Sequence, residues 1–167
     1  MARSQDSERT CPLTIVSGGQ TGVDRGALDA ALGCGARIAG WCPRGRRAED
    51  GRLPARYTLQ ETPSSRYAQR TRWNVRDSDA TLIISPKCPA GGTAFTIECA
   101  ADYAKPVWLA SLRTASAVEM HLPRIEEWIR KLQIVRLNVA GPRGSELPAA
   151  YSLSHAFVSA LLRNHHE

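Results

Sequence analysis

The sequence predicts an α/β protein with one three-layer domain and a mainly parallel central sheet. Three observations lead to this prediction. Short apolar segments of strand type alternate with segments of helical period along the chain. Two of the strand segments end in glycine-rich turns that open a helix. The length of 167 residues suits a single domain, which we place at residues 13–163, between a flexible N-terminal segment (1–12) and a C-terminal tail (164–167).

The first half of the chain alternates strand, turn and helix. Leu13–Ser17 is a short apolar, β-branched run that ends at a glycine pair, which predicts a buried strand entering a turn. The segment Asp24–Leu32 combines strong helix formers with apolar residues at helical spacing, and Asp24 suits its N-cap. Ala36–Trp41 predicts a second strand. The charged stretch of residues 42–57 has no apolar periodicity, so we expect a long functional loop there.

The second half predicts three further strands and four helices. Helices are expected at Ser65–Arg76, Thr93–Ala104, Ala115–Leu132 and Pro148–Leu162, and strands at Ala80–Ser85, Val107–Ala110 and Ile134–Val139. Pro123 should kink or split the third helix. The helix from Thr93 should face the core with Phe95, Ile97, Ala100, Ala101 and Ala104. Repeated strand–helix order favours a Rossmann-like parallel sheet, with ligands at the carboxyl ends of its strands.

The composition favours an anionic small molecule as ligand. The formal net charge of +6 comes mainly from arginine, whose guanidinium suits phosphate and carboxylate groups. Because the arginines are dispersed along the chain, a nucleic-acid partner is not expected. No segment is apolar over the ~20 residues that a membrane helix needs, and the polar first ten residues lack a signal-peptide core. We therefore expect a cytoplasmic protein with no membrane partner.

The cysteines and histidines predict no metal site. The five cysteines contain no CxxC pair, and their odd number argues against a closed disulfide framework. The four histidines lack the HxxxH or HExxH spacing that places two imidazoles on one helix face. We expect reduced thiols and no bound metal.

Two glycine-rich turns, Ser17–Asp24 (SGGQTGVD) and Pro89–Thr93 (PAGGT), carry the predicted binding site. Glycine lets backbone N–H groups approach an oxyanion, and the helix that follows adds a partial positive charge. A side chain at Gly19 should crowd that anion. A purely structural role, capping and redirecting the chain, is the alternative for each turn. The predicted binding residues are Gly18, Gly19, Gln20, Thr21, Gly22, Asp24, Arg46, Gly91, Gly92, Thr93 and Glu98.

Neither turn matches the GxGxxG or GxxxxGK[ST] pattern, which disfavours a dinucleotide enzyme or a P-loop NTPase. Catalytic groups are sparse as well. Ser17 has no GxSxG context, and only Glu98 lies one helical turn beyond a glycine turn. These residues favour a binding protein over an enzyme.

Five separated strings resemble the molybdenum cofactor carrier proteins: IVSGGQTGVDRGALDAAL, GWCPRGRRAEDG, RYAQRTRWNVRDSDATLIIS, GGTAFTIE and NVAGPR. The resemblance runs from about Leu13 to Leu162. It implies a Rossmann-like fold, a homo-oligomer (dimer or tetramer), and the molybdenum cofactor, a phosphorylated pyranopterin also called molybdopterin, as bound cargo. It also implies molybdoenzymes or cofactor-synthesis proteins as partners.

A catalytic alternative comes from the wider nucleotide-binding group that this fold resembles. That group contains the Lonely Guy phosphoribohydrolases and the lysine-decarboxylase-like proteins. Those hydrolases carry PGGxGTxxE. Placing Gly91 and Gly92 on its first two glycines brings Glu98 onto the catalytic glutamate, and Arg70 falls near the catalytic arginine. The third glycine and the threonine are replaced here by Ala94 and Phe95. Hydrolysis of a nucleoside monophosphate is therefore the alternative to a carrier, and a nucleotide sensor that uses the 42–57 loop is the third.

Overall fold

The computed structural model describes residues 13–165. The expected flexible segment 1–12 lies outside this range. Five strands form one parallel sheet, in the order β2 (Arg37–Ala39), β1 (Thr14–Val16), β9 (Arg136–Ala140), β7 (Ala80–Ile84) and β8 (Val107–Ala110). The helices are α1 (Val23–Gly33), α2 (Tyr67–Arg76), α3 (Gly91–Asp102), α4 (Ala115–Lys131) and α5 (Ala150–Asn164).

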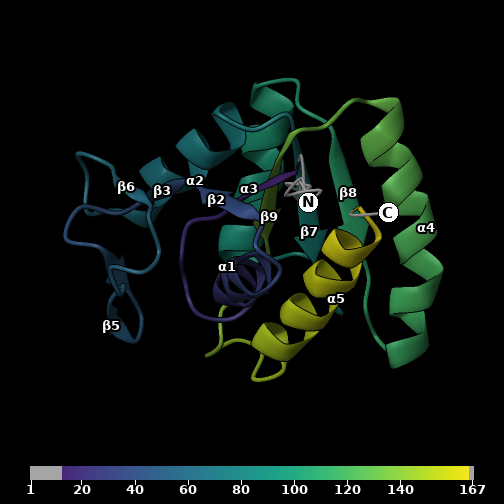
Figure 1. Cartoon of the computed structure of the whole chain (residues 1–167). Coiled ribbons are helices and arrows are strands. Elements are labelled where there is room, and N and C mark those ends of the chain that lie inside the picture. The colour runs from purple at the N-terminus through teal and green to yellow at the C-terminus, as the bar shows by residue number, and fades with distance from the viewer. Residues whose placement is uncertain (1–12, 166–167) are drawn as a thin grey trace, which may run out of the picture.

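Helices cover both faces of the sheet, which confirms the predicted three-layer α/β fold (Figure 1). On one face, apolar side chains of α1, α4 and α5 pack against Ile15, Leu82 and Val139. On the other face, Val75 of α2 and Ala100 of α3 form a smaller cluster. All five residues of β7 are buried, as expected for a parallel strand with helices on both sides.

The second predicted strand is shorter than its apolar pattern. It ends at Ala39, because Gly40 has a φ of 134° and lies so close to Ser17 that an added Cβ would be 2.2 Å from the Ser17 carbonyl oxygen. The chain then leaves the sheet and begins β3 (Trp41–Cys42), which pairs in parallel with β6 (Gln60–Glu61).

The 42–57 stretch contains regular structure that its composition hides. Within it, β4 (Arg47–Ala48) and β5 (Gly51–Arg52) form an antiparallel hairpin, and this segment projects from the sheet at the left of Figure 1. A second apolar cluster joins the stretch to α1 through Leu28, Cys42, Leu53, Tyr57 and Leu59. The predicted long loop thus contains a hairpin and part of a small core, which the sequence pattern missed because this core depends on contacts with α1.

Three helix predictions are corrected by the structure. Gly22, with φ 80°, occupies the N-cap of α1 in place of Asp24, whose side chain turns toward α2 instead. Helix α4 runs through Pro123 without splitting. Helix α3 ends at Asp102, Ala101 and the following Ala104 are exposed, and the buried residues of the helix are Thr93, Thr96, Cys99 and Ala100. Threonine is tolerated there because the Thr96 hydroxyl donates to the Gly92 carbonyl at 2.9 Å.

No helix among residues 13–165 is long and apolar enough to cross a membrane.

Candidate functional site

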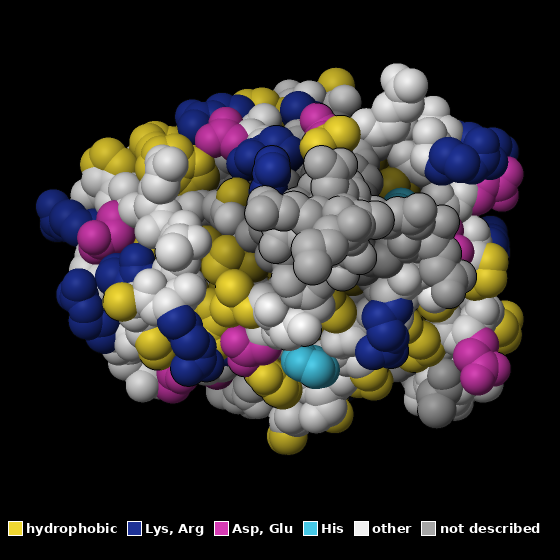
Figure 2. Space-filling model, in the orientation of Figure 1, with side chains coloured by type: hydrophobic (Ala, Val, Ile, Leu, Met, Phe, Trp, Pro, Cys, Tyr) yellow, Lys and Arg dark blue, Asp and Glu magenta, His cyan; other side chains and the backbone are white. Residues whose placement is uncertain are grey.

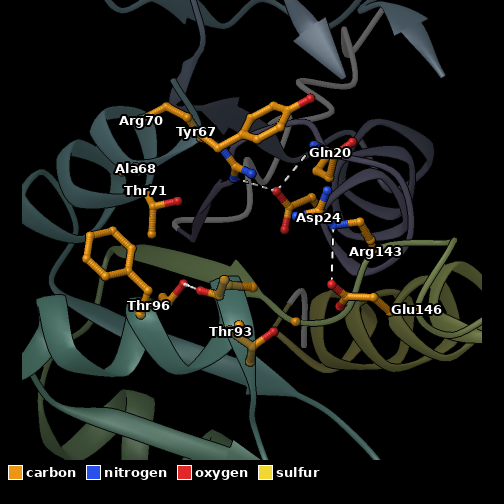
Figure 3. A pocket seen from close by; sticks show the side chains of 15 residues that line it. Gln20, Asp24, Tyr67, Ala68, Arg70, Thr71, Thr93, Thr96, Arg143 and Glu146 are labelled. Atoms are coloured by element: carbon orange, nitrogen blue, oxygen red, sulfur yellow. Dashed lines mark hydrogen bonds and ion pairs between the residues drawn. The ribbon is translucent and has the colours of Figure 1, made fainter. Parts of the chain in front are cut away.

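A cavity of about 280 Å³ lies where three parallel strands end. Turns and helices that follow β1, β7 and β9 meet there, and α2 closes one side (Figure 3). This is the position at which open parallel α/β sheets bind ligands. The lining residues are Gln20, Asp24, Tyr67, Ala68, Arg70, Thr71, Gly91, Gly92, Thr93, Phe95, Thr96, Ala140, Gly141, Arg143 and Glu146.

An ion pair between Asp24 and Arg70 forms one wall of the cavity. Arg70 Nη1 lies 3.0 Å from Asp24 Oδ2, and the two side chains are 13% and 6% exposed. Burial raises the pKa of Asp24, although the Arg70 guanidinium and the N–H of Gln20 oppose that shift. Gly18 lies beneath the guanidinium, where an added Cβ would be 2.0 Å from Nη1. The first glycine turn therefore makes room for Arg70.

The second glycine turn forms the first residues of α3 at the edge of the cavity. Gly91 and Gly92 are exposed and line the cavity, and an added Cβ at either would meet nothing within 4 Å. No side chain caps this helix end, so its first N–H groups remain available to a ligand. Arg70 and Arg143 line the same cavity and are paired there with Asp24 and Glu146. This combination of helix end and guanidinium groups suits a phosphate.

Aromatic side chains form another part of the wall. Tyr67 and Phe95 are half-buried lining residues. The Tyr67 ring has guanidinium carbons of Arg70 and Arg143 at 5.6 and 5.7 Å from its centre, distances at which cation–π attraction operates. These rings give the cavity a surface against which a planar group can lie.

Thr21 holds loops together and does not line the cavity. Its hydroxyl donates to Glu49 and accepts from the N–H of Gly144 at 3.0 Å. Glu49 also accepts from the N–H and the hydroxyl of Ser145, at 3.0 and 2.6 Å. Some loss of solvent around the exposed Glu49 acts to raise its pKa, but the hydrogen bonds from Ser145 and Thr21 outweigh it and lower the pKa. Glu49 thus links the β4–β5 hairpin to the first turn and to the loop after β9.

Three of the predicted binding residues, Gly19, Gly22 and Arg46, contact other parts of the protein and do not line the cavity. Gly19 has φ 75°, and an added Cβ would be 2.7 Å from Leu53, so a side chain there would disturb the small core and would not crowd an anion. Gly22 faces the Pro142 carbonyl. Arg46 donates to the carbonyls of Leu53, Pro54, Tyr57 and Leu59 and so orders its own segment.

Of the predicted site residues, the structure brings together Gln20, Asp24, Arg70, Gly91, Gly92 and Thr93. Glu98 is exposed on α3 and does not line the cavity. Sequence reasoning missed Tyr67 and Arg143 as lining residues. A signal for Arg143 was present: the string NVAGPR is a third glycine turn after a strand.

Charged side chains on the visible face and candidate metal ligands are the other features of interest for a site. Figure 2 shows Lys and Arg side chains spread over the visible face, with acidic side chains among them. Among residues 13–165, no group of three or more His, Cys, Asp or Glu side chains could hold a metal ion.

Comparisons with known proteins identify a family and a structural relative. The sequence model of the circularly permutated YpsA SLOG family matches residues 15–162. The crystal structure named "Putative molybdenum carrier protein", from Syntrophus aciditrophicus SB, is 43% identical and has a TM-score of 0.85, covering 89% of this chain and 94% of that one. No curated protein matches the sequence.

Proposed function

This chain belongs to the circularly permutated YpsA SLOG family, and we propose that it binds the molybdenum cofactor as cargo. The name of its 43% identical structural relative supports molybdenum-related binding. The cofactor is a pterin with a phosphate, so a protein that carries it needs an anion site and a surface for a planar ring within one cavity.

The observation that carries the proposal is the meeting of the α3 N-terminus with Arg70 and Arg143 beside two aromatic rings. In this proposal the phosphate binds the first N–H groups of α3, at Gly91 and Gly92, with the guanidinium groups as counter-charges. The pterin lies along Tyr67 and Phe95. Burial of the ligand in the cavity limits its contact with water and oxygen.

A carrier fits the cavity better than a phosphoribohydrolase does. The hydrolase alternative requires Arg70 and Glu98 to act on one substrate. Arg70 lines the cavity, whereas Glu98 is exposed elsewhere on α3. A general acid or base must come within hydrogen-bonding reach of the reacting group, and Glu98 is not among the residues that surround the cavity.

Cofactor retention tests the proposal. The purified protein is incubated with isolated molybdenum cofactor without oxygen and passed through gel filtration, and molybdenum and pterin are measured in the protein fraction. We expect co-elution and slower oxidation of the cofactor. Arg143→Gln should weaken retention roughly tenfold, since a hydrogen bond to a charged group contributes about 1.5–3 kcal/mol. The control is Arg76→Gln, because Arg76 is half-exposed, pairs with Asp77 and lies outside the cavity lining.

A parent protein that neither retains the cofactor nor slows its oxidation would exclude the carrier function. A panel of nucleoside monophosphates, assayed for free base, tests the hydrolase alternative. Base release that is lost in folded Glu98→Ala protein would favour that alternative over the carrier.

A further inference from the structure

We propose that Gln20 and Asp24 form an oriented donor–acceptor pair that recognises the edge of the ligand's planar heterocycle. This inference rests on the proposed function, because that function supplies a ligand with a planar ring. It adds the two side chains that bind the edge of the ring. Both residues line the cavity, Gln20 from the turn after β1 and Asp24 from the first turn of α1 (Figure 3).

The amide group of Gln20 has one orientation. Its Oε1 accepts from two backbone N–H groups, those of Thr21 at 3.0 Å and Glu49 at 2.8 Å. Only the oxygen of an amide can accept both bonds, so Nε2 must occupy the other position. Gln20 is 5% exposed, and its buried Nε2 has no hydrogen-bond partner among the described residues. A buried amide nitrogen of this kind lacks the partner that most buried polar groups have.

Asp24 supplies an acceptor next to this donor. Its Oδ2 accepts from Arg70 Nη1 at 3.0 Å and from the backbone N–H of Gln20 at 3.3 Å. Both bonds end on the same oxygen, and in Figure 3 the other oxygen is directed into the cavity. The bond from the Gln20 backbone N–H joins the two residues, and both line the same cavity wall.

This arrangement matches a heterocycle that carries an acceptor atom beside a donor atom. A ring carbonyl or ring nitrogen would accept from Gln20 Nε2, and a neighbouring ring N–H or amino group would donate to Asp24 Oδ1. Pterins and purine bases present such an edge. A sugar phosphate without a base has no ring edge, and it would bind through the anion site alone.

Two probes separate recognition of the planar heterocycle from recognition of the phosphate. Pterin has the heterocycle without a phosphate, and ribose 5-phosphate has the phosphate without a planar heterocycle. Gln20→Glu replaces Nε2 by an acceptor oxygen while retaining the oxygen that Thr21 and Glu49 bind. We expect this variant to bind pterin about tenfold more weakly than the parent. Because the new carboxylate can itself repel a phosphate, ribose 5-phosphate is compared in the uncharged Gln20→Met variant, whose affinity for it should change less than threefold. Titration calorimetry measures both, and pterin fluorescence gives a second measurement for the ring.

The matched control is Gln69→Glu. Gln69 also uses its Oε1 to accept from a backbone N–H, that of Ser64 at 2.8 Å, but it lies outside the cavity lining. If Gln20→Glu does not fold, as judged by circular dichroism, the uncharged Gln20→Met variant replaces it. Either folded Gln20 variant that binds pterin as tightly as the parent overturns the proposal, as does a parent that does not bind pterin. Failure of the parent to bind ribose 5-phosphate would instead count against the phosphate site of the proposed function.

Discussion

Arg70 Nη1 lies 3.0 Å from Oδ2 of Asp24, and this ion pair joins α2 to the first turn of α1 across 46 positions of the chain. Both side chains are nearly buried, so neither charge is well solvated. Removing one partner leaves the other as an uncompensated buried charge, which is more costly than losing the pair as a whole.

Arg70→Met should therefore lower the free energy of unfolding by about 3–5 kcal/mol. Asp24→Leu combined with Arg70→Met should be more stable than Arg70→Met alone, because the stranded carboxylate is gone. Urea denaturation at neutral pH measures both variants. Equal stability of the single and double variants would show that the Asp24 charge is solvated in the absence of Arg70.

Gly18 should not accept a larger residue, for a reason specific to Arg70. Gly18→Ala would place a Cβ 2.0 Å from Arg70 Nη1 and 2.8 Å from its Cδ and Cζ atoms. The arginine must then move from Asp24, and we expect a loss of about 1–3 kcal/mol in stability. Gly33→Ala is the control, since an added Cβ there meets nothing within 4 Å. Alanine should stabilise this last residue of α1 by up to about 1 kcal/mol. Thermal unfolding of both variants gives the comparison.

The hydrogen bonds that Glu49 of the hairpin accepts from Thr21 and Ser145 should weaken at acid pH. The folded state lowers the pKa of Glu49 from 4.5, so its stabilising effect is present above that value and is lost as pH falls through the lower, folded-state pKa. Protonation weakens the bonds from Thr21 and Ser145. Hydrogen exchange, corrected for the intrinsic rate, should show the Ser145 amide losing protection below pH 4.5. In Glu49→Gln this loss of protection at low pH should be absent. If the variant loses protection below pH 4.5 as the parent does, another group causes the effect.

Arg46 should decide whether the segment that carries the β4–β5 hairpin is ordered. Its guanidinium donates to four backbone carbonyls between Leu53 and Leu59, so Arg46→Met would leave these acceptors without their donor. We expect faster hydrogen exchange throughout residues 43–59, with the sheet unaffected.

Arg44→Met is the control for this experiment, because the Arg44 side chain is exposed and the structure shows no hydrogen bond from it. Faster exchange in Arg44→Met to the same degree would mean that general charge, and not the four bonds of Arg46, orders the segment.

Local patterns predicted the elements more accurately than the site. The apolar run ATLII predicted β7, and the glycine pair at Gly91 and Gly92 predicted a helix N-terminus without a side-chain cap. Gly19 shows where such reasoning fails. A glycine turn before a helix predicts an anion site, but Leu53, 34 positions later in the chain, occupies the space that the anion was expected to take.

The sequence by itself determined the α/β class, the strand and helix positions and the two glycine turns, because these depend on residues that are close together in the chain. The tertiary structure decided the strand order. The last strand, β9, lies between β1 and β7, and this position brings Arg143 to the cavity. It also decided that Asp24 pairs with Arg70 and that Gln20 Nε2 is left without a partner among the described residues. The physical reason is that these contacts join segments distant in sequence, and hydrophobic periodicity carries no information about which distant segments meet.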